Sequence, residues 1–161
     1  MKKKIKLTSG VSLVNKKYKK KEFYHYIQEP NNVIIVPVIG NKFLLVKQKR
    51  EPINKKNYEF PMGWVDNGES FDEASKRELL EETGYMSLSK PTKILEFFPD
   101  PGRNSRKCVC FYTRSLKKIK KPEKNISVYL KNKKQIESLI KSKNFNNSSH
   151  LAAFYYCINN Y

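Results

Sequence analysis

The sequence predicts an α/β domain in which helices cover both faces of a mixed β-sheet. Two apolar segments, residues 33–39 and 43–50, have the composition of buried strands, and the short turn between them predicts a hairpin. Further along the chain, strand-like segments alternate with helix-like segments, which is typical of a layered α/β architecture. With 161 residues, the chain has the length of one domain that buries a substantial core.

Residues 1–30 are predicted to form an N-terminal strand extension, and residues 31–161 the main domain. The extension is rich in lysine. Its alternating patches at 5–14 and 23–27 predict a first strand or hairpin and then another strand. Pro37 lies inside the first apolar segment of the main domain. Because proline has no N–H to donate to a neighbouring strand, it predicts an edge position or a bulge.

The remaining elements follow from periodicity and from turn residues. Residues 51–57 and 115–125 are polar or basic and are predicted to be loops. Ser148 or Ser149 is predicted to cap the last helix. We expect a helix at 71–83, strands at 92–98, 107–113 and 126–130, and helices at 135–141 and 151–158.

The chain carries a formal net charge of +18, and its basic residues are dense between Arg103 and Lys143. This segment holds fourteen Lys or Arg residues and two acidic residues, Glu123 and Glu137. Such a surface attracts nucleic acid or a polyphosphate substrate, or its lysines are simply solvated. We favour solvated lysines because the sequence has no RNA-binding, zinc-finger or helix-turn-helix motif. Nucleic acid is therefore a partner that the sequence permits but does not favour.

The cysteines and the hydropathy predict a cytoplasmic protein with no membrane partner. The start of the chain lacks the apolar stretch of a secretory signal, and no apolar run is long enough to cross a membrane. An odd number of cysteines argues against a disulfide framework, so we interpret Cys108, Cys110 and Cys157 as small apolar core residues. His25 and His150 are isolated from other metal-binding residues, and we expect them at the surface or at the edge of the core.

Acidic residues gather in one short part of this basic chain. Eight of the fifteen lie between Glu59 and Glu82. Within the predicted helix, Glu78, Glu81 and Glu82 have the spacing i, i+3 and i+4, which crowds three carboxylates onto one face. Like charges at this spacing repel one another and weaken a helix. Either the face is solvated, or a divalent cation, which prefers carboxylate oxygens, turns the cluster into a binding site.

The residues around this cluster predict a loop followed by a well-bounded helix. Gly63 and Gly68 bracket a polar turn. Ser70 followed by Glu73 has the pattern of a capping box, with Ser70 as the N-cap. Gly84 stands where a left-handed residue would end the helix. These signals bound the helix and place the three glutamates in its last two turns.

The complete spacing from Gly63 to Tyr85 is Gly-x5-Glu-x7-Arg-Glu-Leu-x-Glu-Glu-x-Gly and a large apolar residue. It resembles, at every defining position, the Nudix box of hydrolases that act on nucleoside diphosphates linked to another group. The resemblance implies a Nudix-type α/β/α sandwich with a mixed sheet. It also implies a Mg²⁺ cofactor, with Mn²⁺ as the alternative, held by the catalytic residues Glu78, Glu81 and Glu82 and by the backbone carbonyl of Met62.

The resemblance further implies supporting roles for other residues of the box. The counterpart of Arg77 pairs with acidic groups and holds the loop against the helix. Glu69 contacts the metal or supports the loop, and Gly63 permits the turn. A divalent cation at this place would promote attack on a diphosphate, because it neutralises phosphate charge and makes a bound water more acidic.

Outside the box, the sequence resembles the ADP-ribose pyrophosphatase branch of the family. The features that carry this resemblance are an apolar strand ending in Gln-x-Arg at residues 48–50, a Glu-x-Pro-x-Gly pattern at 59–63, and Pro101. The resemblance implies that Arg50 binds a substrate phosphate, the alternative being a surface arginine, and that Glu59 contributes to the substrate or metal site. The branch often carries a catalytic glutamate on a late loop. That loop is basic here and has Glu123 as its only carboxylate, so Glu123 is the candidate base.

We therefore expect Mg²⁺-dependent hydrolysis of ADP-ribose, or of a related nucleoside diphosphate sugar, to a nucleoside monophosphate and a sugar phosphate. One alternative is a Nudix hydrolase that acts on RNA ends or damaged nucleotides, motivated by the basic segment 103–143. Another is a non-catalytic nucleotide sensor on the same fold. The sensor is less favoured because every carboxylate of the box is present. Members of the branch commonly form homodimers through N-terminal strands, so residues 1–30 are the expected dimerisation element.

Overall fold

The computed structural model describes residues 2–19 and 22–161, and its centre is a mixed β-sheet. The strands of this sheet are β4 (Asn32–Ile39), β5 (Lys42–Arg50), β6 (Lys55–Glu59), β7 (Met62–Trp64), β9 (Thr92–Phe97), β10 (Cys108–Thr113) and β12 (Ser127–Lys131). Their order is β12-β5-β4-β10-β9, with β6 paired to β5 and β7 paired to β4. The β4–β10 pair is parallel and the other pairs are antiparallel.

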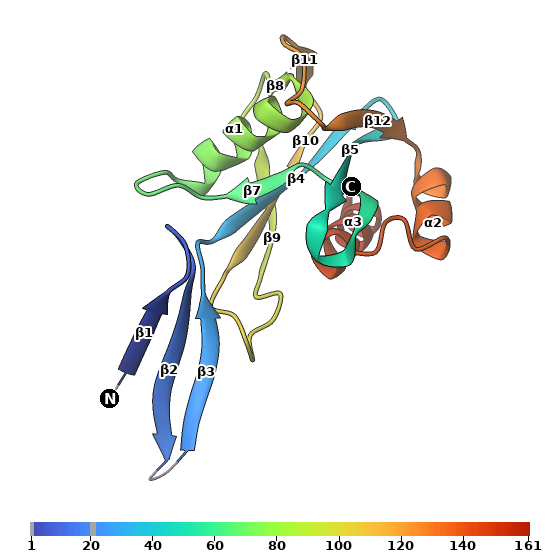
Figure 1. Ribbon diagram of the computed structural model, residues 1–161. Helices are drawn as coiled ribbons and strands as arrows, with labels where there is room; N and C mark the ends of the chain where they lie inside the picture. Colours follow the sequence, from blue (N-terminus) through green and yellow to red (C-terminus); the bar gives the residue numbers. More distant parts are fainter. Residues whose placement is uncertain (1, 20–21) are drawn as a thin grey trace.

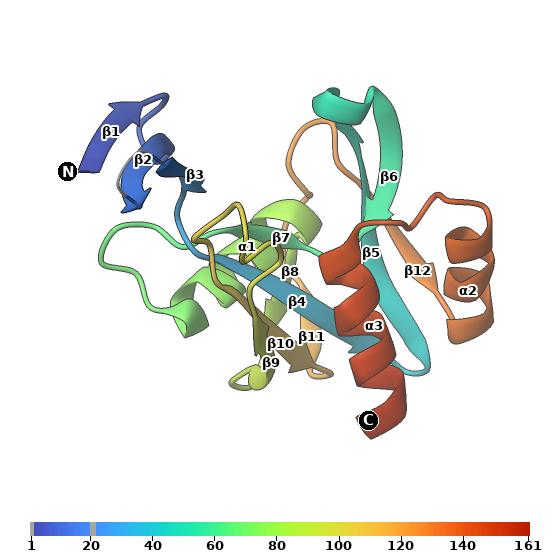
Figure 2. The same cartoon turned by 90° about the horizontal axis from the view of Figure 1, so that it is seen from below.

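Helices cover this sheet on both faces. In the described part of the chain they are α1 (Phe71–Thr83), α2 (Lys133–Lys141) and α3 (Ser148–Asn160). Side chains of β4 alternate between the two faces. Val33 belongs to the same buried cluster as Leu79 of α1, whereas its neighbour Ile34 belongs to a second cluster with Ile136 of α2 and Phe154 of α3. The predicted α/β/α sandwich is thus confirmed, with α1 on one face and α2 and α3 on the other (Figures 1 and 2).

A separate sheet projects from the main domain (Figure 1). It consists of the antiparallel strands β1 (Lys2–Lys6), β2 (Ser12–Lys19) and β3 (Glu22–Gln28). The backbone of Ile27 links it to the domain, because its N–H donates to the Arg103 carbonyl at 2.8 Å and its carbonyl accepts from the Ser105 N–H at 3.0 Å. The strands predicted for the N-terminal part of the chain are confirmed.

β8 (Tyr85–Ser87), which follows α1, pairs with β11 (Leu116–Lys118) in a two-stranded antiparallel sheet. The loop after β11 lies tightly over Gly84, whose carbonyl accepts from the Ile119 N–H at 2.9 Å. A Cβ on Gly84 would lie 2.1 Å from the Lys120 carbonyl oxygen, and the φ of Gly84 is +74°. Both facts require glycine here, and the close contact fixes the basic loop beside the C-terminal end of α1.

The sequence prediction of loops at 51–57 and 115–125 is only partly correct. β6 and β11 occupy parts of these segments. Their residues are mostly polar and lack a strand pattern, and pairing with β5 and β8 holds them extended. The predicted cap of α3 is also wrong: Asn147 is the N-cap, and its side chain accepts from the Ser149 N–H at 3.0 Å.

Pro37 lies in a central strand, so the expected edge position is wrong. N–H groups of residues two apart in a strand point to the same side. The Ile35 N–H donates to the Pro61 carbonyl at 2.9 Å, next to β7, and pairing with β5 begins at Val38. Pro37 therefore lies between the part of β4 that pairs with β7 and the part that pairs with β5. Its missing N–H removes no hydrogen bond between strands there.

The three cysteines are free and buried, as the sequence predicts. His25 is exposed, but His150 is completely buried, with 0% of its surface exposed. The prediction that both histidines lie at the surface or the core edge is therefore wrong for His150. Within residues 2–19 and 22–161, no helix combines the length and the apolar character needed to span a membrane.

Candidate active site

α1 begins and ends at residues that fix it against the preceding loop. The Ser70 hydroxyl accepts from the Glu73 N–H at 3.2 Å, and the Glu73 carboxylate accepts from the Ser70 N–H at 2.9 Å. This is the predicted capping box. At the other end, Gly84 is left-handed, and its N–H donates to the Leu80 carbonyl at 2.9 Å. Loop and helix thus form a defined frame for the glutamates.

Glu78 is buried and lies directly against the backbone of this loop. A Cβ on Gly63 would fall 1.9 Å from Oε1 of Glu78, so only glycine leaves room for the carboxylate. The Glu78 carboxylate therefore lies against the loop at Gly63. Burial raises the pKa of Glu78, which means that its negative charge lacks full compensation in this structure.

Arg77 gathers the loop and two of the three clustered glutamates. Its Nε and Nη2 each donate to Glu69 at 2.9 Å, and Nη2 also donates to the Trp64 carbonyl at 2.7 Å. Its Nη1 donates to Glu78 at 2.7 Å and to Glu81 at 3.2 Å. These contacts raise the pKa of Arg77, with the Glu69 bonds contributing most. The guanidinium thus connects the loop to the carboxylate face of α1.

Glu82 is held from a different direction. One carboxylate oxygen accepts from the Met62 N–H at 3.0 Å, and the other accepts from Gln48 Nε2 at 3.3 Å. Burial raises the pKa of Glu82 to about 7, and repulsion by Glu78 adds to the rise. A neighbouring positive charge would relieve both effects.

The three clustered glutamates fit a hard divalent cation by the chemistry of their oxygen donors. Glu78 and Glu82 are buried carboxylates with raised pKa values, so a cation would supply charge that the site needs. Within the described residues, no three acidic, histidine or cysteine side chains are arranged to hold one ion directly. Glu78 and Glu81 instead share Arg77. Binding of a cation would therefore exchange these contacts for contacts with the ion.

Glu123 lies near the same end of α1. Its N–H donates to the Glu81 carbonyl at 3.0 Å, and its exposed side chain is close enough that its charge helps to raise the pKa of Glu78. The contact between Gly84 and the loop after β11 holds this segment in place. The structure therefore brings the candidate base to the edge of the glutamate cluster.

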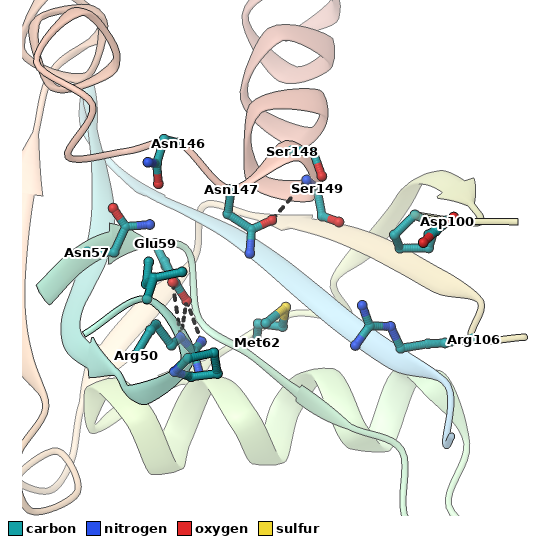
Figure 3. Close-up of a pocket in the computed structure, with 13 residues that line it drawn as sticks. Arg50, Asn57, Glu59, Met62, Asp100, Arg106, Asn146, Asn147, Ser148 and Ser149 are labelled. Atoms are coloured by element: carbon teal, nitrogen blue, oxygen red, sulfur yellow. Dashed lines mark hydrogen bonds and ion pairs between the residues drawn. The ribbon is translucent and has the colours of Figure 1, made fainter. Parts of the chain in front are cut away.

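A cavity of about 560 Å³, whose lining is drawn in Figure 3, adjoins the cluster through Met62. Met62 belongs to both, since it lines the cavity and donates its N–H to Glu82. The cavity walls come from β5, β6, the segment after β9 and the start of α3. The lining residues are Arg50, Pro52, Ile53, Asn57, Glu59, Met62, Pro99, Asp100, Arg106 and Asn146 to Ser149.

Arg50 and Glu59 form a close ion pair in the cavity wall (Figure 3). Nε of Arg50 donates to the two Glu59 oxygens at 3.0 and 3.1 Å, and Nη2 also donates to Glu59. The Glu59 side chain is 1% exposed, whereas that of Arg50 is 34% exposed. Glu59 therefore lies behind Arg50, and a ligand in the cavity would meet the guanidinium.

Several residues of the cavity carry no signal in the sequence. Arg106 pairs with Glu29 at 3.3 Å, and its Nε is buried with no hydrogen-bond partner among the described residues. Asn147 and Ser149 belong to the N-terminal turn of α3, which is favourable for an anion. Sequence reasoning missed these residues, and the buried His150 beside them, because only folding brings them together.

Fold and site together define a domain of the Nudix class. The model of the NUDIX domain matches residues 29–138. The match covers more than half of the chain, and the chain therefore belongs to the Nudix family.

Individual relatives agree with this assignment. The chain is 38% identical over 93 residues to an ADP-ribose pyrophosphatase of Bacillus subtilis, covering 57% of this chain and 48% of the relative. It is 42% identical over 72 residues to an ADP-ribose pyrophosphatase of Saccharomyces cerevisiae, covering 43% of this chain and 30% of the relative. The matches thus span less than half the length of these relatives. The fold is also similar to a solved structure described as an ADP compounds hydrolase, with a TM-score of 0.81, 19% identity, and coverage of 99% of this chain and 90% of the other.

Proposed function

We propose that this protein hydrolyses the diphosphate bond of ADP-ribose, or of a related nucleoside diphosphate sugar, with Mg²⁺ or Mn²⁺ as cofactor. The products would be a nucleoside monophosphate and a sugar phosphate. One observation carries the proposal: Met62 lines a cavity that contains two arginines and also binds Glu82 of the carboxylate cluster. A diphosphate held by the arginines would lie beside the glutamates. The names of the relatives support this choice of substrate class.

The helix residues would hold the divalent cation. Glu78, Glu81 and Glu82 offer carboxylate oxygens, and the carbonyl of Met62 precedes Gly63, the residue against which Glu78 lies. The bound cation would neutralise phosphate charge and make a bound water more acidic. Arg77 would keep the loop in register with the helix through Glu69 and the Trp64 carbonyl.

The cavity residues would hold the substrate. Arg50 and Arg106 both line the cavity, and a guanidinium suits the oxygens of a phosphate. Glu59 would act on the substrate through Arg50, because both of its oxygens accept from that guanidinium. A cavity of about 560 Å³ has the size of a small-molecule site.

Glu123 is the proposed proton acceptor for the attacking water. It lies at the edge of the cluster and is exposed, so it can exchange protons with solvent. Glu123→Gln should lower kcat by about 10²-fold and leave KM nearly unchanged, the size expected for a general base. An unchanged kcat would assign the base to another group.

The test of the activity is incubation with ADP-ribose, ADP-glucose and UDP-glucose in Mg²⁺, in Mn²⁺ or in EDTA. Mass spectrometry should find AMP from the ADP compounds with either metal and no turnover in EDTA. In water enriched in oxygen-18, the label will mark the phosphate that was attacked. If wild-type protein leaves all three compounds intact in Mg²⁺ and Mn²⁺, the proposal is wrong.

A second candidate function is hydrolysis of RNA ends, and the exposed lysines of β11 and of the loop after it favour this function. Lys117, Lys118, Lys120, Lys121 and Lys124 are all exposed and lie next to the candidate base Glu123. If RNA is the substrate, its turnover should fall steeply as the salt concentration rises, because each phosphate contact releases counterions. Turnover of ADP-ribose would change little over the same range.

A nucleotide sensor would bind the same ligands without turning them over. Calorimetric titration of ADP-ribose in saturating Mg²⁺, followed by product analysis of the same sample, separates the two cases. Heat of binding with intact ADP-ribose at the end would identify a sensor.

We also propose that the sheet of β1, β2 and β3 dimerises. Ile5 pairs with Leu13, and Leu13 pairs with Ile27, so these residues and Phe23 share one face. Ile5 is 46% exposed and Phe23 is 52% exposed, which leaves apolar surface for a second copy. Light scattering should give the mass of a dimer for the wild type and of a monomer for Ile5→Asp combined with Phe23→Asp.

A further inference from the structure

His150 occupies an unusual place for a histidine that binds no ligand directly. It lies in the first turn of α3, next to the lining residue Ser149 but behind the cavity wall, and is completely buried. The rings of Phe60 and Phe145 have their centroids 6.2 and 6.1 Å from the imidazole. A purely apolar residue would suit this cluster, so the imidazole must be explained by its polar contacts.

One polar contact fixes the position of the ring proton. Nδ1 of His150 accepts a hydrogen bond from the Phe60 N–H at 3.2 Å. A nitrogen that accepts cannot carry a proton, so the neutral ring carries its proton on Nε2. A doubly protonated ring would lose this acceptor and oppose the Phe60 N–H.

The Nε2 proton faces a carboxylate. Nε2 lies 3.6 Å from Oε2 of Glu59 and has no hydrogen-bond partner within the described part of the chain. This distance is longer than a hydrogen bond, and a shift of about 0.5 Å would close it. His150 therefore stands ready to donate to Glu59 from the side away from the cavity.

Glu59 transmits this contact to the cavity. Its two oxygens accept from Nε and Nη2 of Arg50. The hydrogen bonds of the pair use Nε and Nη2 of Arg50, which leaves Nη1 for a ligand. The orientation of the guanidinium thus depends on the orientation of one buried carboxylate.

We propose that His150 is a positioning residue: through Glu59 it sets the orientation in which Arg50 binds a phosphate of the substrate. The inference rests on the proposed function for the identity of that ligand. Arg50 acts in binding, and the glutamates of α1 lie outside this chain of contacts. Loss of the Nε2 donor should therefore raise KM more than it lowers kcat.

Two substitutions distinguish the role of the Nδ1 acceptor from that of the Nε2 donor. In His150→Asn, the amide oxygen replaces the Nδ1 acceptor for Phe60, but nothing reaches Glu59. In His150→Gln, the longer side chain can place an amide N–H where Nε2 stood. We expect His150→Asn to raise KM for ADP-ribose about 10-fold with kcat within about 2-fold, and His150→Gln to keep KM within about 3-fold. Equal KM values for the wild type and His150→Asn would overturn the proposal.

A double-mutant cycle with Arg50→Ala tests the route through Arg50. The effect of His150→Asn on KM should disappear when Arg50 is already absent, because the two changes remove the same interaction. Additive effects would show that His150 acts only on packing. Melting temperatures of all variants identify any general loss of stability.

The protonation state of His150 can be measured on the wild type, without turnover and without a variant that must fold. Nitrogen-15 spectra of the two histidines should show His150 as the neutral tautomer protonated on Nε2, and titration with AMP should shift its signals. A ring protonated on Nδ1 would overturn the inference. If the wild type turns over no nucleotide, the proposed function fails by itself. The dissociation constant for AMP then replaces KM in comparing His150→Asn with the wild type, and equal constants would still overturn this inference.

Discussion

The candidate site has two halves that are built in different ways. The helix half comes from one continuous stretch, residues 62–84. The cavity half brings together Arg50, Glu59, Arg106 and residues 146–150 from separate parts of the chain. Contacts in the first half are set by spacing along the sequence. Contacts in the second half, such as the one between Phe60 and His150, exist only after the sheet and α3 have packed together.

The halves also differ in their balance of charge. In the helix half, Arg77 is shared by Glu69, Glu78 and Glu81, and burial raises the pKa of Glu78 and Glu82. In the cavity half, Arg50 and Glu59 form a one-to-one pair. One half therefore has negative charge available for a cation, and the other offers guanidinium groups to an anion. A diphosphate bound to a divalent cation needs both.

Glu82→Gln should have the largest effect, because it removes charge from the helix half with little change in shape. A cation contributes several kcal/mol to stabilising such a transition state, so kcat for ADP-ribose should fall by about 10³-fold or more. The amide oxygen of glutamine can still accept from the Met62 N–H, so the fold should persist. Steady-state kinetics and the melting temperature check both points. A variant that keeps a tenth of the wild-type kcat would place the cation elsewhere.

The two halves should respond to pH with opposite signs. Burial lowers the pKa of His150 to about 4, below the usual value of about 6.5. The unfolded chain therefore binds this proton more readily. The stability that neutral His150 confers is complete above pH 6.5 and is lost as the pH falls towards 4, by about 3 kcal/mol. The raised pKa of Glu82 has the opposite effect. The stability that protonated Glu82 confers is complete below the usual glutamate pKa and is lost as the pH rises through 7.

Urea unfolding in EDTA between pH 4 and 7.5 measures these slopes. The difference in free energy of unfolding between the wild type and His150→Asn should shrink as the pH falls from 6.5 to 4. Glu82→Gln should gain stability over the wild type as the pH rises towards 7. Parallel pH curves for the wild type and both variants would contradict the opposite signs.

Gly63→Ala and Gly68→Ala form a matched pair within the loop of the helix half. The new Cβ at position 63 would meet the Glu78 carboxylate at 1.9 Å, whereas at position 68 it would meet nothing within 4 Å. Gly63→Ala should therefore displace Glu78 and lower kcat by about 10- to 100-fold, as loss of a support for a metal ligand does. Gly68 has a φ of +83°, so Gly68→Ala should cost about 1–2 kcal/mol of stability through backbone strain and little activity. Equal kcat values for the two variants would show that the Glu78–Gly63 contact is dispensable.

The smallest effect is expected at the basic loop, which belongs to neither half. Lys120→Ser combined with Lys121→Ser removes two exposed charges, and exposed charges interact weakly in water. KM for ADP-ribose should change less than about 3-fold. A larger loss with RNA substrates than with ADP-ribose would move these lysines into the substrate site and favour the second candidate function.

The sequence predicts the helix half well because its signals are local. The Ser70–Glu73 box and Gly84 bound α1 where the structure has it. The i, i+3 and i+4 spacing of the glutamates is a property of any helix. The motif also contains Gly63, the residue whose missing side chain leaves space for the Glu78 carboxylate.

The cavity half is predicted only in part. Arg50 and Glu59 stand out by resemblance, but their pairing depends on β5 lying beside β6, a strand whose polar residues give no pattern. Arg106 and His150 are single residues without a motif, and burial is decided by packing against distant aromatic residues. The edge position predicted for Pro37 was wrong for a similar reason. The expectation that proline avoids central strands does not consider which strand pairs with β4 at each residue.

Trp64 gives the helix half its own optical signal. It is the one tryptophan of the chain, it is 42% exposed, and its carbonyl accepts from the same guanidinium that holds Glu78 and Glu81. If a cation drew the glutamates away from Arg77, the charge distribution around the peptide that carries the indole would change. Fluorescence from a single, naturally placed chromophore can therefore report occupancy of the site without label, substrate or mutation.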